Sequence, residues 1–128
     1  MKMNRREARE KAIQTLFQLD NIELPVDEAM RYIVEEKTNS FYEQLVRGTM
    51  EYRDEIDKLL TEQLENWALD RLPKIERTVL RLALYELKYN QEAPERVIIN
   101  EAIELCKTFG DEKSGRFVNG VLSKFTLK

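Results

Sequence analysis

The sequence predicts an all-α protein, and three observations support this class. Apolar residues recur at spacings of three and four along almost the whole chain, as they do in helices that bury one face. No pair of segments shows the strict alternation of apolar and polar residues that is typical of neighbouring strands. The three prolines stand between the periodic segments. The 128 residues, 42% of them apolar, suit one hydrophobic core, so we expect a single domain over residues 1–128 with six or seven helices.

Four helical segments are predicted in the first half of the chain. The first begins after Asn4, a residue that caps helix N-termini well, and ends near residue 20. Its apolar stripe consists of Ala8, Ala12, Leu16 and Leu19. The second begins after Pro25, and the third begins at Ser40, which has the spacing of a capping box with Glu43. A fourth helical period runs unbroken over residues 50–67.

Three more helices are predicted in the second half. Pro73 suits a first helical turn, and residues 74–90 are apolar on nearly all sides, which is typical of a helix in the middle of a bundle. After Pro94, the β-branched residues 97–99 predict an extended segment that leads into a helix ending at residues 109–110. The last helix covers residues 112–125 approximately.

Composition argues against an enzyme. The chain has no histidine, which removes imidazole general bases and histidine-containing zinc sites. The one cysteine, Cys106, cannot supply a zinc site built from thiolates, and no spacing of carboxylates singles out a magnesium site. We therefore expect no catalytic residues, no metal and no cofactor.

The sequence also predicts a cytoplasmic protein with no membrane partner. No run approaches the roughly 18 apolar residues of a membrane span, and no signal-peptide pattern opens the chain. A single cysteine cannot form an internal disulfide, which fits a reducing compartment.

Charge is distributed unevenly along the chain, whose net charge is −3. Residues 1–12 carry five cations and two acids, and residues 113–128 carry four cations and no acid. The body between them is strongly acidic. Basic ends attract a polyanion and an acidic body attracts a basic protein, so this pattern indicates two partners of opposite charge. Either basic end could instead be a solvated surface.

The first predicted helix has the residue types of an RNA-binding surface. Arg5, Arg6 and Arg9 outnumber the two acids of the same segment, and Phe17 lies on the flank that carries Arg6. Guanidinium groups pair with phosphates through two hydrogen bonds, and an aromatic ring stacks on an unpaired base. Alternatively, Phe17 packs against a neighbouring helix and the arginines are solvated.

Residues 113–120 repeat these ingredients, with two cations, an aromatic ring and an amide. RNA contacts by Lys113, Arg116, Phe117 and Asn119 are one interpretation. Burial of Phe117 in the core is the other. The basic ends add Lys2 and Lys124 to the candidates for RNA binding.

Several stretches resemble the NusB family of bacterial transcription antitermination factors. They are RREAREKAIQTLFQ at residues 5–18, WALDRL at 67–72, IERTVLRLALYEL at 75–87, NEAIELCKTFG at 100–110 and FVNGVL at 117–122. They follow in family order and include both ends of the chain and its central helix.

This resemblance implies an all-α domain of two small helical bundles. It also implies a function. NusB-like proteins pair with the ribosomal protein NusE, and the pair binds single-stranded boxA RNA in nascent ribosomal RNA transcripts. The complex joins elongating RNA polymerase, together with other Nus factors, and suppresses premature termination.

The resemblance further implies roles for individual residues. Arg5, Arg6 and Arg9 match the family's arginine-rich motif, and Phe17 matches an aromatic position near RNA. Phe117, Asn119 and Lys124 fall in the RNA-proximal C-terminal region. The candidates for contact with the protein partner are Glu76, Arg77 and Tyr85.

Two other functions stay open at this point. NusB-like folds also precede ribosomal RNA cytosine methyltransferases, so the chain could be the accessory domain of such an enzyme. It could also be a purely protein-binding helical adaptor whose basic ends only provide solubility.

Overall fold

Helices account for every regular element that the computed structural model describes, over residues 3–34, 40–65 and 68–126. The seven α-helices are α1 (Arg5–Asn21), α2 (Val26–Ile33), α3 (Ser40–Glu51), α4 (Arg53–Gln63), α5 (Lys74–Tyr89), α6 (Glu95–Phe109) and α7 (Glu112–Leu122). Two short 3₁₀ turns, η1 (Leu69–Arg71) and η2 (Ser123–Phe125), complete them. The predicted all-α class is confirmed.

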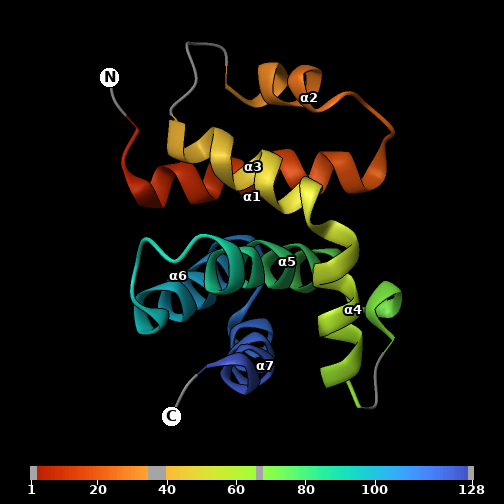
Figure 1. Ribbon diagram of the computed structural model, residues 1–128, viewed down its shortest axis with the longest axis vertical. Helices are drawn as coiled ribbons and strands as arrows, with labels where there is room; N and C mark the ends of the chain where they lie inside the picture. Colours follow the sequence, from red (N-terminus) through yellow and green to blue (C-terminus); the bar gives the residue numbers. More distant parts are fainter. Residues whose placement is uncertain (1–2, 35–39, 66–67, 127–128) are drawn as a thin grey trace.

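The helices form two groups stacked along the longest axis of the molecule (Figure 1). In one group α1 packs against α2 and α3, and in the other α5 packs against α4, α6 and α7. Contacts of α1 and α3 with α5 join the groups. This arrangement agrees with the two small bundles that the family resemblance implies.

The hydrophobic core follows the predicted helical stripes. Ala8, Ala12, Leu16 and Leu19 of α1 are all buried, and α1 begins with a capping box between Asn4 and the third helical residue. Helix α5 is buried at ten of its sixteen positions, so it is the central helix that its composition predicts.

One prediction about the second half is wrong. Residues 97–99 are not an extended lead-in, because α6 already begins at Glu95, directly after Pro94. Ile98, Ala102 and Leu105 are buried at helical spacing on its inner face. The cost of a β-branched residue in a helix is a few tenths of a kcal/mol, which burial of that face outweighs.

The predicted helix over residues 50–67 is also interrupted. Tyr52 lies between α3 and α4 with φ −98° and ψ 12°, and its ring stacks on that of Tyr89 with centroids 4.2 Å apart. Helix α4 then ends at Gln63, because Leu64 turns to an extended conformation and is buried. Trp67 lies outside the described residues.

No helix in the described ranges has the length and apolar character that crossing a bilayer requires.

Candidate nucleic-acid interface

Helix α1 presents two arginines at its start. Arg5 and Arg6 have side chains that are 55% and 60% exposed. Each approaches a carboxylate from a distant part of the sequence: Arg5 lies 3.4 Å from Glu92, and Arg6 lies 3.3 Å from Glu101 of α6. The guanidinium of Arg5 also stacks on the Phe41 ring at 4.2 Å. Exposed ion pairs of this kind are weak, so both guanidinium groups can exchange a carboxylate for a phosphate.

Arg9, one turn after Arg6, is buried in the protein, although its Nη1 also lies 3.9 Å from Glu101. Its side chain is 3% exposed, and Nε and Nη2 donate to the two carboxylate oxygens of Glu86, both at 2.8 Å. Burial alone would lower the pKa of Arg9, but the hydrogen bonds and charge of Glu86 outweigh burial and raise it. The guanidinium therefore joins α1 to α5.

This placement corrects the expectation that Arg9 contacts RNA. Cations outnumber acids within α1 itself. The carboxylates that pair with Arg5, Arg6 and Arg9 belong instead to α5, α6 and the turn between these two helices.

Phe17 lies on the same side of α1 as Arg6. Eleven residues separate them, which at about 100° per residue returns to within roughly 20° and advances about 16 Å along the axis. The Phe17 ring is half-buried and borders a shallow depression of about 300 Å³, whose other walls are Ile13, Gln14, Ile75 and Phe109. The ring thus packs along one edge and retains open surface.

Lys74 is a residue of this surface that sequence reasoning missed. Its ammonium group lies 6.0 Å from the centre of the Phe17 ring. A signal existed in the sequence: Lys74 is the first residue of α5, and the positive end of the helix dipole disfavours a cation there. A cation in that position indicates an interaction outside its own helix.

The predicted RNA residues of α7 are mostly at the surface. Lys113, Arg116 and Asn119 are exposed. Arg116 and Asn119 border a second depression of about 290 Å³ between α6 and α7. Phe117 is half-buried and packs against the core, as its alternative interpretation expected.

The two basic ends do not meet in one cluster. Arg5 and Arg6 contact the turn before α6 and α6 itself, whereas Lys124 donates to the carbonyl of Gln63 at the end of α4, in the other group of helices. Figure 1 shows the start of α1 and the end of α7 in different groups of helices, separated along the long axis. Lys2 lies outside the described residues.

Tertiary contacts connect the Phe17 depression to the start of α7. Ile75 lines the depression, and its side chain also lies against Gly110, at the turn between α6 and α7. The next residue, Glu76, accepts a hydrogen bond from Ser114 of α7 at 2.9 Å. A continuous strip therefore runs from Arg6 past Phe17 and Lys74 to the first turn of α7.

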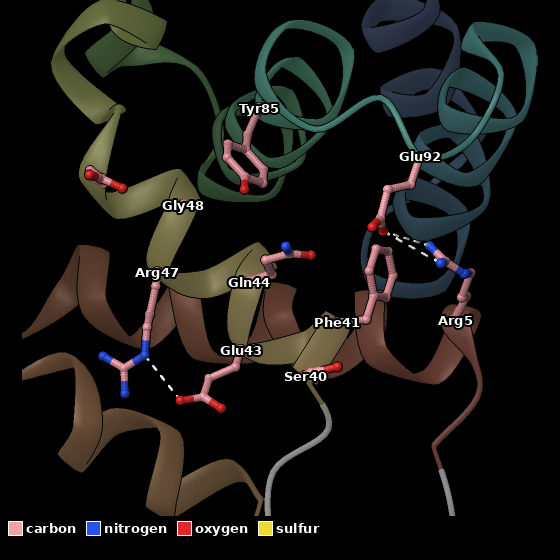
Figure 2. Close-up of a pocket in the computed structure, with 10 residues that line it drawn as sticks. Arg5, Ser40, Phe41, Glu43, Gln44, Arg47, Gly48, Tyr85 and Glu92 are labelled. Carbon is pink, nitrogen blue, oxygen red and sulfur yellow. Dashed lines mark hydrogen bonds and ion pairs between the residues drawn. The ribbon is translucent and has the colours of Figure 1, made fainter.

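The three candidate partner residues do not share a surface. Glu76 is half-buried beside α7, whereas Tyr85 is buried in a cleft between α3 and α5 (Figure 2). Nine residues separate these two on α5, which places them on opposite sides of the helix.

Arg77 has a structural role instead. Its Nη2 donates to Asp20 at 2.6 Å, and its Nη1 donates to the carbonyl oxygens of Asp70 and Leu72. The residue is 9% exposed, so the expectation that Arg77 contacts a partner is corrected.

Asp20 is the centre of a buried charge network. It accepts from Arg77 and, at 3.2 Å, from Arg81, which also binds Asp57 through two hydrogen bonds of 2.8 and 3.0 Å. Burial by itself would raise the pKa of Asp20, but the hydrogen bond and charge of Arg77 and the charge of Arg81 outweigh burial and lower it. The network joins the end of α1 to α4 and α5.

The chemistry of the strip suits binding rather than catalysis. It combines exposed cations with half-buried aromatic rings. Within the described residues, no group of histidine, cysteine or carboxylate side chains has the geometry of a metal site.

Comparison with known proteins identifies relatives along almost the whole chain. Residues 6–127 match the NusB family. The transcription antitermination protein NusB of Lysinibacillus sphaericus (strain C3-41) is 66% identical over 124 residues, which is 97% of this chain and 98% of the relative. The NusB protein of Bacillus subtilis (strain 168) is 52% identical over 122 residues, covering 94% of this chain and 93% of the relative.

Solved structures agree with these relatives. NusB of T. maritima superposes with a TM-score of 0.88 at 38% identity and covers 98% of this chain and 92% of its own. A chain from a crystal structure of antitermination factors NusB and NusE in complex with dsRNA superposes with a TM-score of 0.85 at 32% identity, covering 94% of both chains.

Proposed function

The chain belongs to the NusB family, and from that premise we propose that it is a transcription antitermination factor that pairs with NusE and binds boxA RNA. It acts as a cytoplasmic, non-enzymatic adaptor, as one domain over residues 1–128. Together with NusE and other Nus factors, it connects nascent ribosomal RNA to elongating RNA polymerase.

One observation carries this proposal. The solved complex of NusB and NusE with double-stranded RNA contains a chain that matches 94% of this one at a TM-score of 0.85. Almost every residue of this chain therefore has an aligned position in that relative, so the residues that form its binding surfaces have counterparts here.

The strip from Arg6 to α7 supplies a mechanism for RNA binding. Arg5, Arg6, Lys74 and Lys113 neutralise phosphates and release counterions, which provides affinity without sequence preference. An unpaired base stacks on the exposed side of Phe17, which is worth about 1–3 kcal/mol. Sequence preference then comes from unstacked bases that are read beside NusE.

NusE contact is proposed on the side of α5 that carries Glu76. This side adjoins both the Phe17 depression and α7, so a partner there would extend the RNA surface. Such a composite surface explains why we expect the chain alone to bind RNA weakly.

Fluorescence anisotropy with labelled RNA tests the proposal. Single-stranded boxA RNA, a scrambled strand of equal length and a boxA duplex are titrated with the chain, alone and with NusE. We expect weak binding alone and clearly tighter binding of single-stranded boxA with NusE. Equal affinity for boxA and scrambled RNA in the presence of NusE would contradict the specificity.

The same titration separates the alternatives. A purely protein-binding adaptor would capture NusE and retain no RNA. An accessory domain of a methyltransferase is disfavoured by the relatives themselves, because they are named antitermination proteins and this chain covers 93–98% of their length.

A further inference from the structure

A cleft on the other side of α5 is separate from the Phe17 depression and from the Glu76 side proposed for NusE, and it shares only Arg5, at its edge, with the residues proposed for RNA. It lies between α3 and α5, has a volume of about 570 Å³, and is open at the surface (Figure 2). Its size is within the range of about 300–1,000 Å³ that is typical of ligand sites. Tyr85 forms its floor, opposite the Glu76 side of the same helix.

Tyr85 is a mostly buried residue whose hydroxyl forms no hydrogen bond to any residue that the structure describes. Tyr85 is only 6% exposed, yet its hydroxyl points into the cleft toward α3 (Figure 2). The ring is held by stacking against Tyr52 and Tyr89, with centroids 6.3 Å away in each case. Because the hydroxyl borders the open cleft, it can accept a hydrogen bond from a ligand there.

Gly48 allows the ring to occupy this position. A Cβ atom at residue 48 would overlap the Tyr85 ring, so only glycine permits α3 to pass so close to it. The close approach fixes the hydroxyl at the base of the cleft, where α3 and α5 provide rigid walls.

The charge that the cleft offers to a ligand is negative. Its lining contains three carboxylates and two guanidinium groups. Both guanidinium groups are already occupied: Arg5 is bound to Glu92, and Arg47 is bound to Glu43 and Asp27. Glu51 forms no ion pair with any described residue. Burial, the neighbouring Tyr52 and the charges of nearby carboxylates, Glu51 among them, raise the pKa of Tyr85, as expected in a negative field.

We propose that this cleft binds a lysine or arginine side chain from an extended segment of a protein partner. The cationic head group donates to the Tyr85 hydroxyl oxygen and pairs with Glu51. Phosphate groups of RNA are excluded by the same carboxylates that attract the cation. The cleft is thus a second protein-docking surface, on the side of α5 opposite Glu76.

Nuclear magnetic resonance of the ¹⁵N-labelled full chain tests this assignment. The probe is the peptide acetyl-Gly-Arg-Gly-Arg-Gly-amide, and the control probe has glutamate in place of both arginines. We expect the basic peptide to shift the backbone amides of Gln44, Gly48 and Glu51, and the acidic peptide to shift none of them.

Two variants locate the contact without removing the ring or the fold. Tyr85→Phe keeps the stacked ring and loses only the hydroxyl, and Glu51→Gln changes an exposed residue that has no ion pair with the residues that the structure describes. Each variant is expected to lower the affinity for the basic peptide about three- to tenfold, since each removes a contact to a charged group. Glu62→Gln, an exposed acid near the end of α4, is the matched control and should leave peptide affinity unchanged.

The proposal is overturned if both variants bind the basic peptide as tightly as the parent chain does. It is also overturned if the peptide shifts only backbone amides near acidic residues outside the cleft. Shifts of the amides of Gln44, Gly48 and Glu51 by boxA RNA in place of the peptide would also overturn it. Glu51→Gln should not alter boxA affinity, so failure of this proposal is distinguishable from failure of RNA binding.

Discussion

The two ends of α1 use arginine–carboxylate pairs in opposite ways. At the C-terminal end, Asp20 meets Arg77 and Arg81, whose side chains are 11% exposed. At the N-terminal end, Arg5 and Arg6 meet Glu92 and Glu101 with more than half of each guanidinium side chain exposed. The first set joins α1 to α5 and, through the pair of Arg81 with Asp57, to α4, whereas the second set remains open to exchange with an external anion.

Burial explains the difference. Removing one partner from a buried pair leaves an uncompensated charge and costs about 3–5 kcal/mol, while an exposed pair contributes about 0–1 kcal/mol. The network at Asp20 therefore determines stability, and the pairs at Arg5 and Arg6 determine what the surface can bind. Arg9, only three residues after Arg6, belongs to the first kind.

The largest effect is expected for Asp20→Ala. This change leaves Arg77 buried without its carboxylate and should lower the free energy of unfolding by about 3 kcal/mol, measured by urea denaturation. Glu23→Ala, an exposed acid just after α1, should change it by less than about 0.5 kcal/mol. Equal effects of the two variants would contradict the comparison.

Protonation of Asp20 at low pH should weaken the same charge network. The pKa of Asp20 is lower in the folded protein than in the unfolded chain, where it is about 3.9. The stability that this shift provides is complete well above pH 4 and is lost as the pH falls through the folded pKa. The difference in unfolding free energy between the parent chain and Asp20→Asn should therefore shrink below pH 4. A difference that stays constant with pH would exclude Asp20 as the titrating group.

At the exposed surface, Phe17→Ala should have the largest effect on RNA. Loss of one stacked base reduces boxA affinity about tenfold in the presence of NusE, measured by anisotropy. Tyr32→Ala is the control, because Tyr32 is 63% exposed on α2, away from the strip. If both variants bind alike, Phe17 is a packing residue only.

The smallest effect is expected for Glu101→Gln. Arg6 then has no carboxylate to leave when it meets a phosphate, so boxA affinity should rise about two- to threefold. Glu101 also lies 3.9 Å from the buried Arg9, which keeps both of its hydrogen bonds to Glu86 in this variant. Glu104→Gln removes the same charge from the same helix, but Glu104 pairs with Lys107 of α6 and not with α1. Its effect on boxA affinity therefore measures the long-range electrostatic contribution alone. A rise of equal size in both variants would mean that the Arg6 pair is irrelevant.

Much of the fold could be predicted from the sequence, because periodicity is a local signal. The cap at Asn4 and the buried stripe of α1 are as predicted. The sequence placed the start of α6 too late and did not predict the break at Tyr52. Both errors have the same cause, because tertiary contacts decide between local conformations of similar energy.

The roles of individual arginines could not be predicted in the same way. Arg9 pairs with Glu86, 77 positions away, and Arg77 pairs with Asp20, 57 positions away. Charge counted along a segment contains no information about such partners. Family motifs do not separate them either, since Arg6 and Arg9 stand in the same motif, yet Arg6 is exposed and Arg9 is buried.

The salt dependence of RNA binding most directly tests whether Arg5 and Arg6 contact RNA phosphates. The slope of log affinity against log salt is measured for boxA with NusE, for the parent chain and for the Arg5→Ala/Arg6→Ala double variant. Two lost phosphate contacts on a single strand should flatten the slope by about 1.4, with little change in stability. An unchanged slope would mean that these guanidinium groups keep their carboxylates and never contact RNA.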